Sequence, residues 1–422
     1  MKILIKNTKL LSMTDSKIEE KDILIKDGKI EKISDNIEEN DVKIIDGTKT
    51  LTMPGLINCH THVGMSLFRN FADDEDLQTW LNEKIWPLED KLTKEDVYIA
   101  SMLSILEMIK TGTTTFADMY YLEDETIKAI KETGIRAQIS RGLTDLADDG
   151  LDELKENVEL FNKYNDLYMI DIGFGPHAIY TTNSKFLQKC SDTAKELNAP
   201  MHIHLAETKV ENDDAIEKYN MTPTEFMEKN HIFDQRTIAA HGVYLTDNDL
   251  KILANHDVSV IHCPSSNLKL GSGFLDVTRL KNNGVNVALG TDSSASNNHL
   301  SMFKEMNMTS LVSKIHNPKN LNAYEVLEMA TVNGAKALGL EDRIGTIEEG
   351  KDADIIIIDI DNINHTPNNN LISSLCYSTY ESDVRDVIIN GKLVYENRKF
   401  NGIDVDEIIK RASEDFEKLK ER

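Results

Sequence analysis

Histidines in this 422-residue chain occur in short motifs that could bind a divalent metal ion. Alternate side chains of an extended strand share one face, so His60 and His62 can chelate a single ion. His204 and Asp292 complete a set of three imidazoles and one carboxylate, which suits Zn²⁺ and also accommodates Fe²⁺ or Mn²⁺. A second metal usually needs a bridging ligand, and segment 169–176 contains no lysine that could become one. We therefore expect one Zn²⁺ ion per subunit.

Two further residues could move protons near such an ion. Bound Zn²⁺ lowers the pKa of its water to about 7, and the resulting hydroxide needs a partner that takes and delivers a proton. Glu207 follows His204 by three residues, which is close to the metal without being a ligand. His241 could stabilise the developing charge together with Asp292. The combination predicts hydrolysis, with Glu207, His241 and Asp292 as the catalytic residues.

The elements that must position these residues alternate regularly between short apolar strands and amphipathic helices. Eight strands are expected, at 56–60, 113–118, 135–141, 169–176, 200–207, 237–241, 258–263 and 285–292. This alternation predicts parallel strands with right-handed crossovers, and eight such units fit a (β/α)₈ TIM barrel. In that fold the carboxyl ends of the strands, where most of these polar residues fall, meet at one face. A doubly wound open sheet is the alternative, but no GxGxxG or GxxxxGK[ST] motif opens any unit.

The two ends of the chain are expected to form a second, smaller domain. Asp27-Gly28 and Asn390-Gly391 each separate alternating apolar residues, which is typical of a β-hairpin. We therefore predict a small β-sandwich domain built from both chain ends. The predicted boundaries are residues 1–54 for its N-terminal part, 55–344 for the metal-dependent barrel, and 345–422 for its C-terminal part with a terminal helix.

The composition of the chain limits which kinds of partner the protein can bind and where in the cell we expect it. Lys and Arg number 47 against 72 Asp and Glu, a net charge of −25, so there is no excess of basic residues for nucleic acid or an anionic membrane. No apolar run approaches the ~20 residues of a membrane helix, and the N-terminus does not read as a signal peptide. The four cysteines are far apart and form no CxxC pair, which indicates free thiols in a reducing cytoplasm. We expect a cytoplasmic protein that binds a small molecule.

Six motifs of the chain have a recognisable pattern: PGLINCHTHVGMS (54–66), GFGPH (173–177), HIHLAET (202–208), AAHGVYL (239–245), HCPSSNLKLGSG (262–273) and GTDSSASNN (290–298). They resemble the motifs of the amidohydrolase superfamily. Trp86-Pro87-Leu88-Glu89, Arg141 and His177 narrow the resemblance to the 5-methylthioadenosine/S-adenosylhomocysteine deaminases. The resemblance extends over nearly the whole chain.

The resemblance implies a single zinc on His60, His62, His204 and Asp292. It also implies that zinc-bound hydroxide attacks C6 of the adenine ring of a 5′-substituted adenosine, and that ammonia leaves to give the inosyl product. Glu207 would carry the proton to the ring nitrogen. The implied substrates are 5′-methylthioadenosine, S-adenosylhomocysteine, 5′-deoxyadenosine and adenosine, and such proteins often form homo-oligomers.

Substrate contacts follow from the same resemblance. Glu89 would hold the ribose hydroxyls, since a carboxylate can accept two hydrogen bonds. His177 would touch the purine, and Arg141 would face the homocysteine carboxylate. Trp86 is either an apolar wall of the site or a structural aromatic. Glu207 and Asp292 would contact the reacting end of the substrate.

One departure bears on the substrate. The family can use a second arginine soon after the position of Arg141, but the next arginine here is Arg236. Segment 144–150 instead carries Asp145, Asp148 and Asp149. A substrate carboxylate would lose a charge-assisted partner and meet negative charge there. We therefore expect a preference for 5′-substituted adenosines without a carboxylate.

Two other functions remain open from the sequence. One is another one-metal amidohydrolase, such as a guanine or cytosine deaminase or a hydrolase of ring substituents, which would not need Glu89 to hold a ribose. The other is a catalytically inactive metal-binding relative. Such a relative would lack Glu207, His241 or a metal ligand, and this chain retains all of them.

Overall fold

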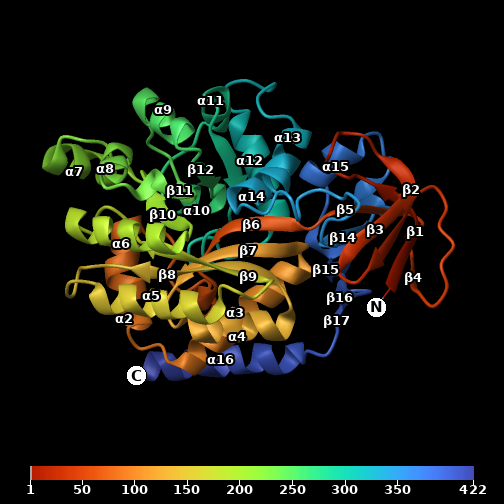
Figure 1. The fold of residues 1–422 in the computed structure, drawn as a ribbon, viewed down its shortest axis with the longest axis horizontal. Coiled ribbons are helices and arrows are strands. Elements are labelled where there is room, and N and C mark those ends of the chain that lie inside the picture. The colour runs from red at the N-terminus through yellow and green to blue at the C-terminus, as the bar shows by residue number, and fades with distance from the viewer. Residues whose placement is uncertain (1) are drawn as a thin grey trace.

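The computed structural model describes residues 2–422 and contains a barrel with a separate sheet beside it (Figure 1). The barrel strands are all parallel and neighbour one another in chain order. They are β6 (Leu56–Thr61), β7 (Thr113–Tyr120), β8 (Arg136–Leu143), β9 (Ile170–Pro176), β10 (Met201–Leu205), β11 (Thr237–His241), β12 (Ser259–His262) and β13 (Asn286–Leu289). All eight predicted strands are present, which confirms the (β/α)₈ barrel.

Helices cover the outside of the barrel, and several begin at the caps that their sequences encode. Thr93 and Asp96, and likewise Thr246 and Asp249, form capping boxes at the starts of α3 and α9. The helices that follow the barrel strands are α3 (Lys94–Lys110), α4 (Glu123–Thr133), α5 (Leu151–Tyr164), α6 (Ser184–Leu197), α7 (Lys209–Tyr219), α8 (Pro223–Lys229), α9 (Asp247–Asn255), α10 (Pro264–Lys269), α11 (Val277–Asn282), α12 (Met302–Ser313), α13 (Ala323–Met329) and α14 (Val332–Ala337). Within residues 2–422, no helix combines the length and the apolar character needed to cross a membrane.

The second sheet combines both chain ends, as expected, and its red and blue strands lie together in Figure 1. β5 pairs antiparallel with β14, so Pro54 lies opposite Ile355 and the two ends join there. The two predicted hairpins turn at Asp27-Gly28 and at Asn390-Gly391. The strands are β1 (Lys2–Leu10), β2 (Glu19–Lys26), β3 (Lys29–Ser34), β4 (Lys43–Asp46), β5 (Thr50–Pro54), β14 (Ile355–Asp359), β15 (Val384–Ile389), β16 (Lys392–Glu396) and β17 (Lys399–Phe400). α15 (Leu371–Tyr377) lies between β14 and β15.

The sequence did not predict the short helices that precede α3. They are η1 (Val63–Phe68), α1 (Leu77–Thr79), the π-helical turn η2 (Trp80–Ile85) and α2 (Trp86–Glu89). The terminal helix α16 (Val405–Glu421) packs beside them, and its Leu419 joins the same buried cluster as Phe68 and Trp80. The C-terminal helix therefore supports the segment that carries Trp86 and Glu89.

A buried arginine links the barrel to the second sheet. Arg136 starts β8, and its Nε lies 2.9 Å from an Asp354 oxygen while its Nη2 lies 2.9 Å from an Asp352 oxygen.

Replacing Arg136 by Met would leave two buried carboxylates without this partner. We expect the free energy of unfolding to fall by about 3–5 kcal/mol, measured by chemical denaturation. Lys163→Met, which removes an exposed ion pair with Asp124, is the matched control and should change it little. A change for Arg136→Met no larger than for the control would contradict this role.

Candidate metal centre and active site

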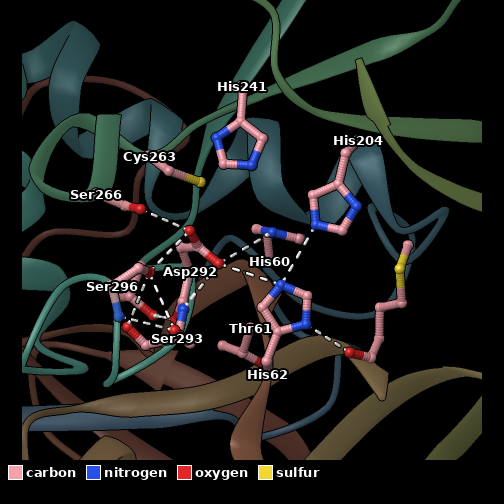
Figure 2. Close-up of polar contacts among 12 residues, drawn as sticks. His60, Thr61, His62, His204, His241, Cys263, Ser266, Asp292, Ser293 and Ser296 are labelled. Atoms are coloured by element: carbon pink, nitrogen blue, oxygen red, sulfur yellow. Dashed lines mark hydrogen bonds and ion pairs between the residues drawn. The ribbon is translucent and has the colours of Figure 1, made fainter. Parts of the chain in front are cut away.

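The four expected metal ligands meet at the carboxyl ends of the barrel strands (Figure 2). His60 and His62 lie at the end of β6, His204 lies near the end of β10, and Asp292 follows β13. The Oδ1 atom of Asp292 is 3.4 Å from Nε2 of His60 and 3.2 Å from Nε2 of His62. Nε2 of His204 is 3.3 Å from Nε2 of His62. These donor atoms are close enough together to share one ion.

Hydrogen bonds on the far side of each imidazole fix its orientation. Nδ1 of His62 lies 2.6 Å from the carbonyl oxygen of Met119, and Nδ1 of His204 lies 2.9 Å from that of His177. A carbonyl can only accept, so both Nδ1 atoms carry a proton and both Nε2 atoms are directed at the centre. With Nδ1 protonated, Nε2 is the atom of each ring that can bind a metal ion.

His60 gives an independent test of whether an ion fits. Its Nδ1 lies 2.8 Å from Nε2 of His202. Its own Nε2 is fully buried and makes no hydrogen bond in the part of the chain that the structure describes, although the Asp292 carboxylate lies 3.4 Å away. Buried polar atoms are normally satisfied, so this nitrogen beside a carboxylate fits the role of a metal ligand. His202 lies beneath the site and orients His60, a role that its spacing from His204 did not reveal.

Asp292 is held rigidly by the loop that follows β13. Its backbone has a φ of +60°, which is unusual for a non-glycine residue and occurs often at functional sites. The hydroxyls of Ser266 and Ser296 donate to its Oδ2 over 2.6 and 2.9 Å. Burial alone would raise the pKa of Asp292, but contact with His60 and His62 holds it well below its ordinary value. The carboxylate is therefore ionised and preset for a cation.

Close packing at the end of β13 needs a glycine. A Cβ on Gly290 would lie 2.8 Å from that of His60, nearer than such atoms approach. The backbone N–H of Asp292 donates to the carbonyl oxygen of His60 over 3.0 Å, which brings the last strand against the first. The same contact that nearly closes the barrel thus places Asp292 beside the histidines.

The two expected proton-handling residues face each other across this centre. Nε2 of His241 lies 3.7 Å from an oxygen of Glu207, and Asn267 accepts a 2.8 Å hydrogen bond at the other ring nitrogen of His241. His241 also reaches the metal centre, since one ring nitrogen each of His60, His204 and His241 lies within 4.8 Å of the others. Burial raises the pKa of Glu207, which favours a carboxyl group that can accept and return a proton.

A cavity of about 650 Å³ opens from the metal centre. Trp86, Glu89, Arg141 and His177 all line it, as expected for residues that contact a substrate. This volume lies within the range typical of pockets for small molecules. These four residues therefore share one cavity with His62, His204 and Asp292.

Glu89 and His177 are each held in place by a partner that the sequence did not reveal. The hydroxyl of Tyr120 donates to the carboxylate of Glu89 over 2.6 Å, and burial raises the pKa of this carboxyl group. Nδ1 of His177 lies 3.0 Å from the hydroxyl of Thr181. Burial lowers the pKa of His177 to about 3, so its imidazole is neutral. Tyr120 is 31 positions away from Glu89, and Thr181 belongs to no motif, so neither partner could be found from the sequence.

The acidic segment after β8 was expected to lie where a substrate carboxylate would bind, but its three aspartates do not face the cavity. None of Asp145, Asp148 and Asp149 is among the residues that line the cavity in the described chain. Asp145 accepts a hydrogen bond from the backbone of Asn183, and Asp148 accepts one from that of Gly150. Their carboxylates stabilise the loop, and a different acid, Glu153, lines the cavity near Arg141.

A (β/α)₈ barrel with this histidine–aspartate centre is the architecture of a metal-dependent hydrolase. The model of the amidohydrolase family matches residues 51–394, and the chain belongs to this family. This confirms the resemblance expected from the motifs.

The chain resembles several characterised or solved proteins over its full length. It is 46% identical to a 5-methylthioadenosine/S-adenosylhomocysteine deaminase of Caldanaerobacter subterraneus subsp. tengcongensis, covering 98% of each chain. It is 42% identical to a 5′-deoxyadenosine deaminase of Methanobrevibacter smithii, covering 99% of this chain and 98% of the relative. An adenosine deaminase of Xanthomonas campestris, solved with bound zinc, superposes with a TM-score of 0.97 at 31% identity, covering 100% of this chain and 99% of that one.

Proposed function

We propose that this protein is a metal-dependent aminohydrolase that converts 5′-substituted adenosines to the inosyl product and ammonia. The observation that carries the proposal is one cavity with the metal centre and Glu207 in one part of its wall and Glu89 in another. The half-buried Glu89, fixed by Tyr120, suits two hydrogen bonds from ribose hydroxyls. Relatives named for 5′-methylthioadenosine, S-adenosylhomocysteine and 5′-deoxyadenosine support the same substrate class.

We propose that His60, His62, His204 and Asp292 hold one Zn²⁺ ion. Support comes from the buried Nε2 atom of His60, which makes no hydrogen bond in the described chain, from the Nε2 atoms of His62 and His204 directed at the centre, and from the ionised Asp292. Such an ion supplies a Lewis acid that makes water nucleophilic at neutral pH.

The chain's own residues then move protons and orient the ring. Glu207 takes a proton from the attacking water and delivers it to a ring nitrogen next to C6. His241, fixed by Asn267, faces Glu207 and stabilises the charge that develops together with Asp292. The neutral imidazole of His177 lies against the purine. All four cysteines are buried and unpaired, which is consistent with the cytoplasmic location that we propose.

A substrate panel on protein with a defined zinc content tests this proposal. The panel contains 5′-methylthioadenosine, 5′-deoxyadenosine, adenosine, free adenine, guanine and cytosine. We expect ammonia release and the ultraviolet change of adenine to hypoxanthine with the three nucleosides. Faster turnover of guanine or cytosine would show that the enzyme belongs to another branch of the family, and ammonia from none of the six would contradict the proposal.

Replacing Glu89 by Gln tests the role of this residue in ribose binding. Hydrogen bonds to a charged group contribute about 1.5–3 kcal/mol, so we expect KM for a nucleoside to rise by about 10- to 100-fold. The inhibition constant of free adenine, which has no ribose, should change far less. Glu83→Gln, on the exposed side of the same segment, is the matched control. Equal changes of KM for the nucleoside and of the inhibition constant of the free base would contradict the ribose-binding role.

A further inference from the structure

Arg141 lies among acidic side chains. Its Nε is 3.2 Å from a Glu156 oxygen, and its Nη2 is 3.6 Å from a Glu153 oxygen. Its third nitrogen donates to the carbonyl oxygen of Gly142. The positive charge of Arg141 is therefore already opposed by two carboxylates before any substrate binds.

Of these two acids, Glu153 is the one that faces the cavity. It lines the cavity with Arg141, and its side chain is 30% exposed, against 63% for Glu156. The backbone N–H of Thr144 donates to Glu153 over 2.7 Å, so the carboxylate is fixed in this position. A partly buried charge acts on a ligand more strongly than an exposed one, which water and salt screen.

The cavity that contains this pair of charges also has apolar side chains in its wall. Trp86, Leu81 and Leu146 line the same cavity as Arg141 and Glu153. An uncharged alkylthio group would bury apolar area against these side chains. A free carboxylate placed at Arg141 would instead lie beside the fixed Glu153 and compete with it for the same guanidinium.

We propose that Glu153 is a specificity-determining residue that disfavours 5′-substituents carrying a carboxylate. Because Glu153 balances the charge of Arg141, the site selects adenosines with a small uncharged 5′-group over S-adenosylhomocysteine. This inference rests on the proposed function and names the residue that sets the substrate preference within it.

The test compares kcat/KM for S-adenosylhomocysteine with kcat/KM for 5′-methylthioadenosine. Wild-type protein should favour 5′-methylthioadenosine. Glu153→Gln keeps an acceptor for Thr144 and removes the charge, and it should raise the ratio toward S-adenosylhomocysteine by about tenfold or more. Glu156→Gln is the matched control, since it removes an exposed acid from the same arginine, and its ratio should stay within about threefold of wild type. Glu153→Asp keeps the charge and should also stay near the wild-type ratio.

The outcomes separate this inference from the proposed function. Wild-type preference for S-adenosylhomocysteine, which needs no variant, would overturn the inference alone. So would an unchanged ratio in Glu153→Gln, or an equal rise in Glu153→Asp, which would assign the effect to the loop rather than to the charge. Absence of turnover of both substrates by the zinc-loaded wild type would overturn the proposed function and the inference with it.

Discussion

Replacing Glu207 by Gln is expected to lower kcat for 5′-methylthioadenosine by about 10²- to 10⁴-fold, the usual contribution of a positioned general acid–base. Glu207 is buried, and its backbone N–H donates to Glu211 over 2.7 Å, so its carboxyl group is aimed at the cavity by a fixed turn. Gln has nearly the same shape and can still hydrogen-bond, but it cannot carry a proton between water and the ring. The measurement is steady-state kinetics on protein with a known zinc content.

The zinc content separates this role from metal binding. Because Glu207 is not among the four proposed ligands, Glu207→Gln should bind as much zinc as the wild type. Glu217→Gln, on the neighbouring helix α7, is the matched control and should keep wild-type kcat. A Glu207→Gln variant that retains kcat within tenfold of wild type, or that loses its zinc, would contradict the assignment.

Removal of the metal is expected to abolish turnover, and added Zn²⁺ should restore it. Without the ion, the centre formed by His60, His62, His204 and Asp292 contains no Lewis acid that could make water nucleophilic at neutral pH. Zinc should also stabilise the fold, by about 2.7 kcal/mol when its free concentration is 100 times its Kd. Activity and the thermal midpoint, followed together during zinc titration of chelator-treated protein, check both effects.

Substitution of the proposed ligands tests the role of the metal without a chelator. His62→Ala and His204→Ala should fail to retain zinc, and added zinc should not raise their thermal midpoint. His256→Ala removes a partly exposed histidine that pairs with Glu228 and serves as the matched control. Full activity in thoroughly metal-free protein would contradict the mechanism.

The barrel could be predicted from the sequence because the local apolar pattern of each strand matches its buried position in the fold. Each buried parallel strand is a short apolar run, so the eight runs could be found without knowing how they pack. The spacing of His60 and His62 fixed their common face, since it depends only on the two-residue period of a strand. Glu207 is placed differently, by the turn after β10, where Ala206 has a φ of +49° and the backbone N–H of Glu207 donates to Glu211.

Residues whose roles depend on distant contacts could not be found in this way. Tyr120 meets Glu89 across 31 positions, and Asn267 meets His241 across 26, so neither pair has a local signature. The π-helical turn at 80–85 interrupts the regular helical period, so the short helices around Trp86 could not be predicted. The acidic residues of 144–150 were visible in the sequence, but only the fold shows that Glu153 is the acid lining the cavity beside Arg141.

The central claim is that water replaces the amino group at C6 of a 5′-substituted adenosine. The most direct measurement incubates the zinc-loaded protein with 5′-methylthioadenosine in water enriched in oxygen-18 and analyses the products by mass spectrometry. The account predicts one ammonia per product and a single heavy oxygen on the purine ring, with the ribose and the methylthio group intact. Cleavage of the glycosidic bond, loss of the methylthio group, or a product without heavy oxygen on the ring would contradict it.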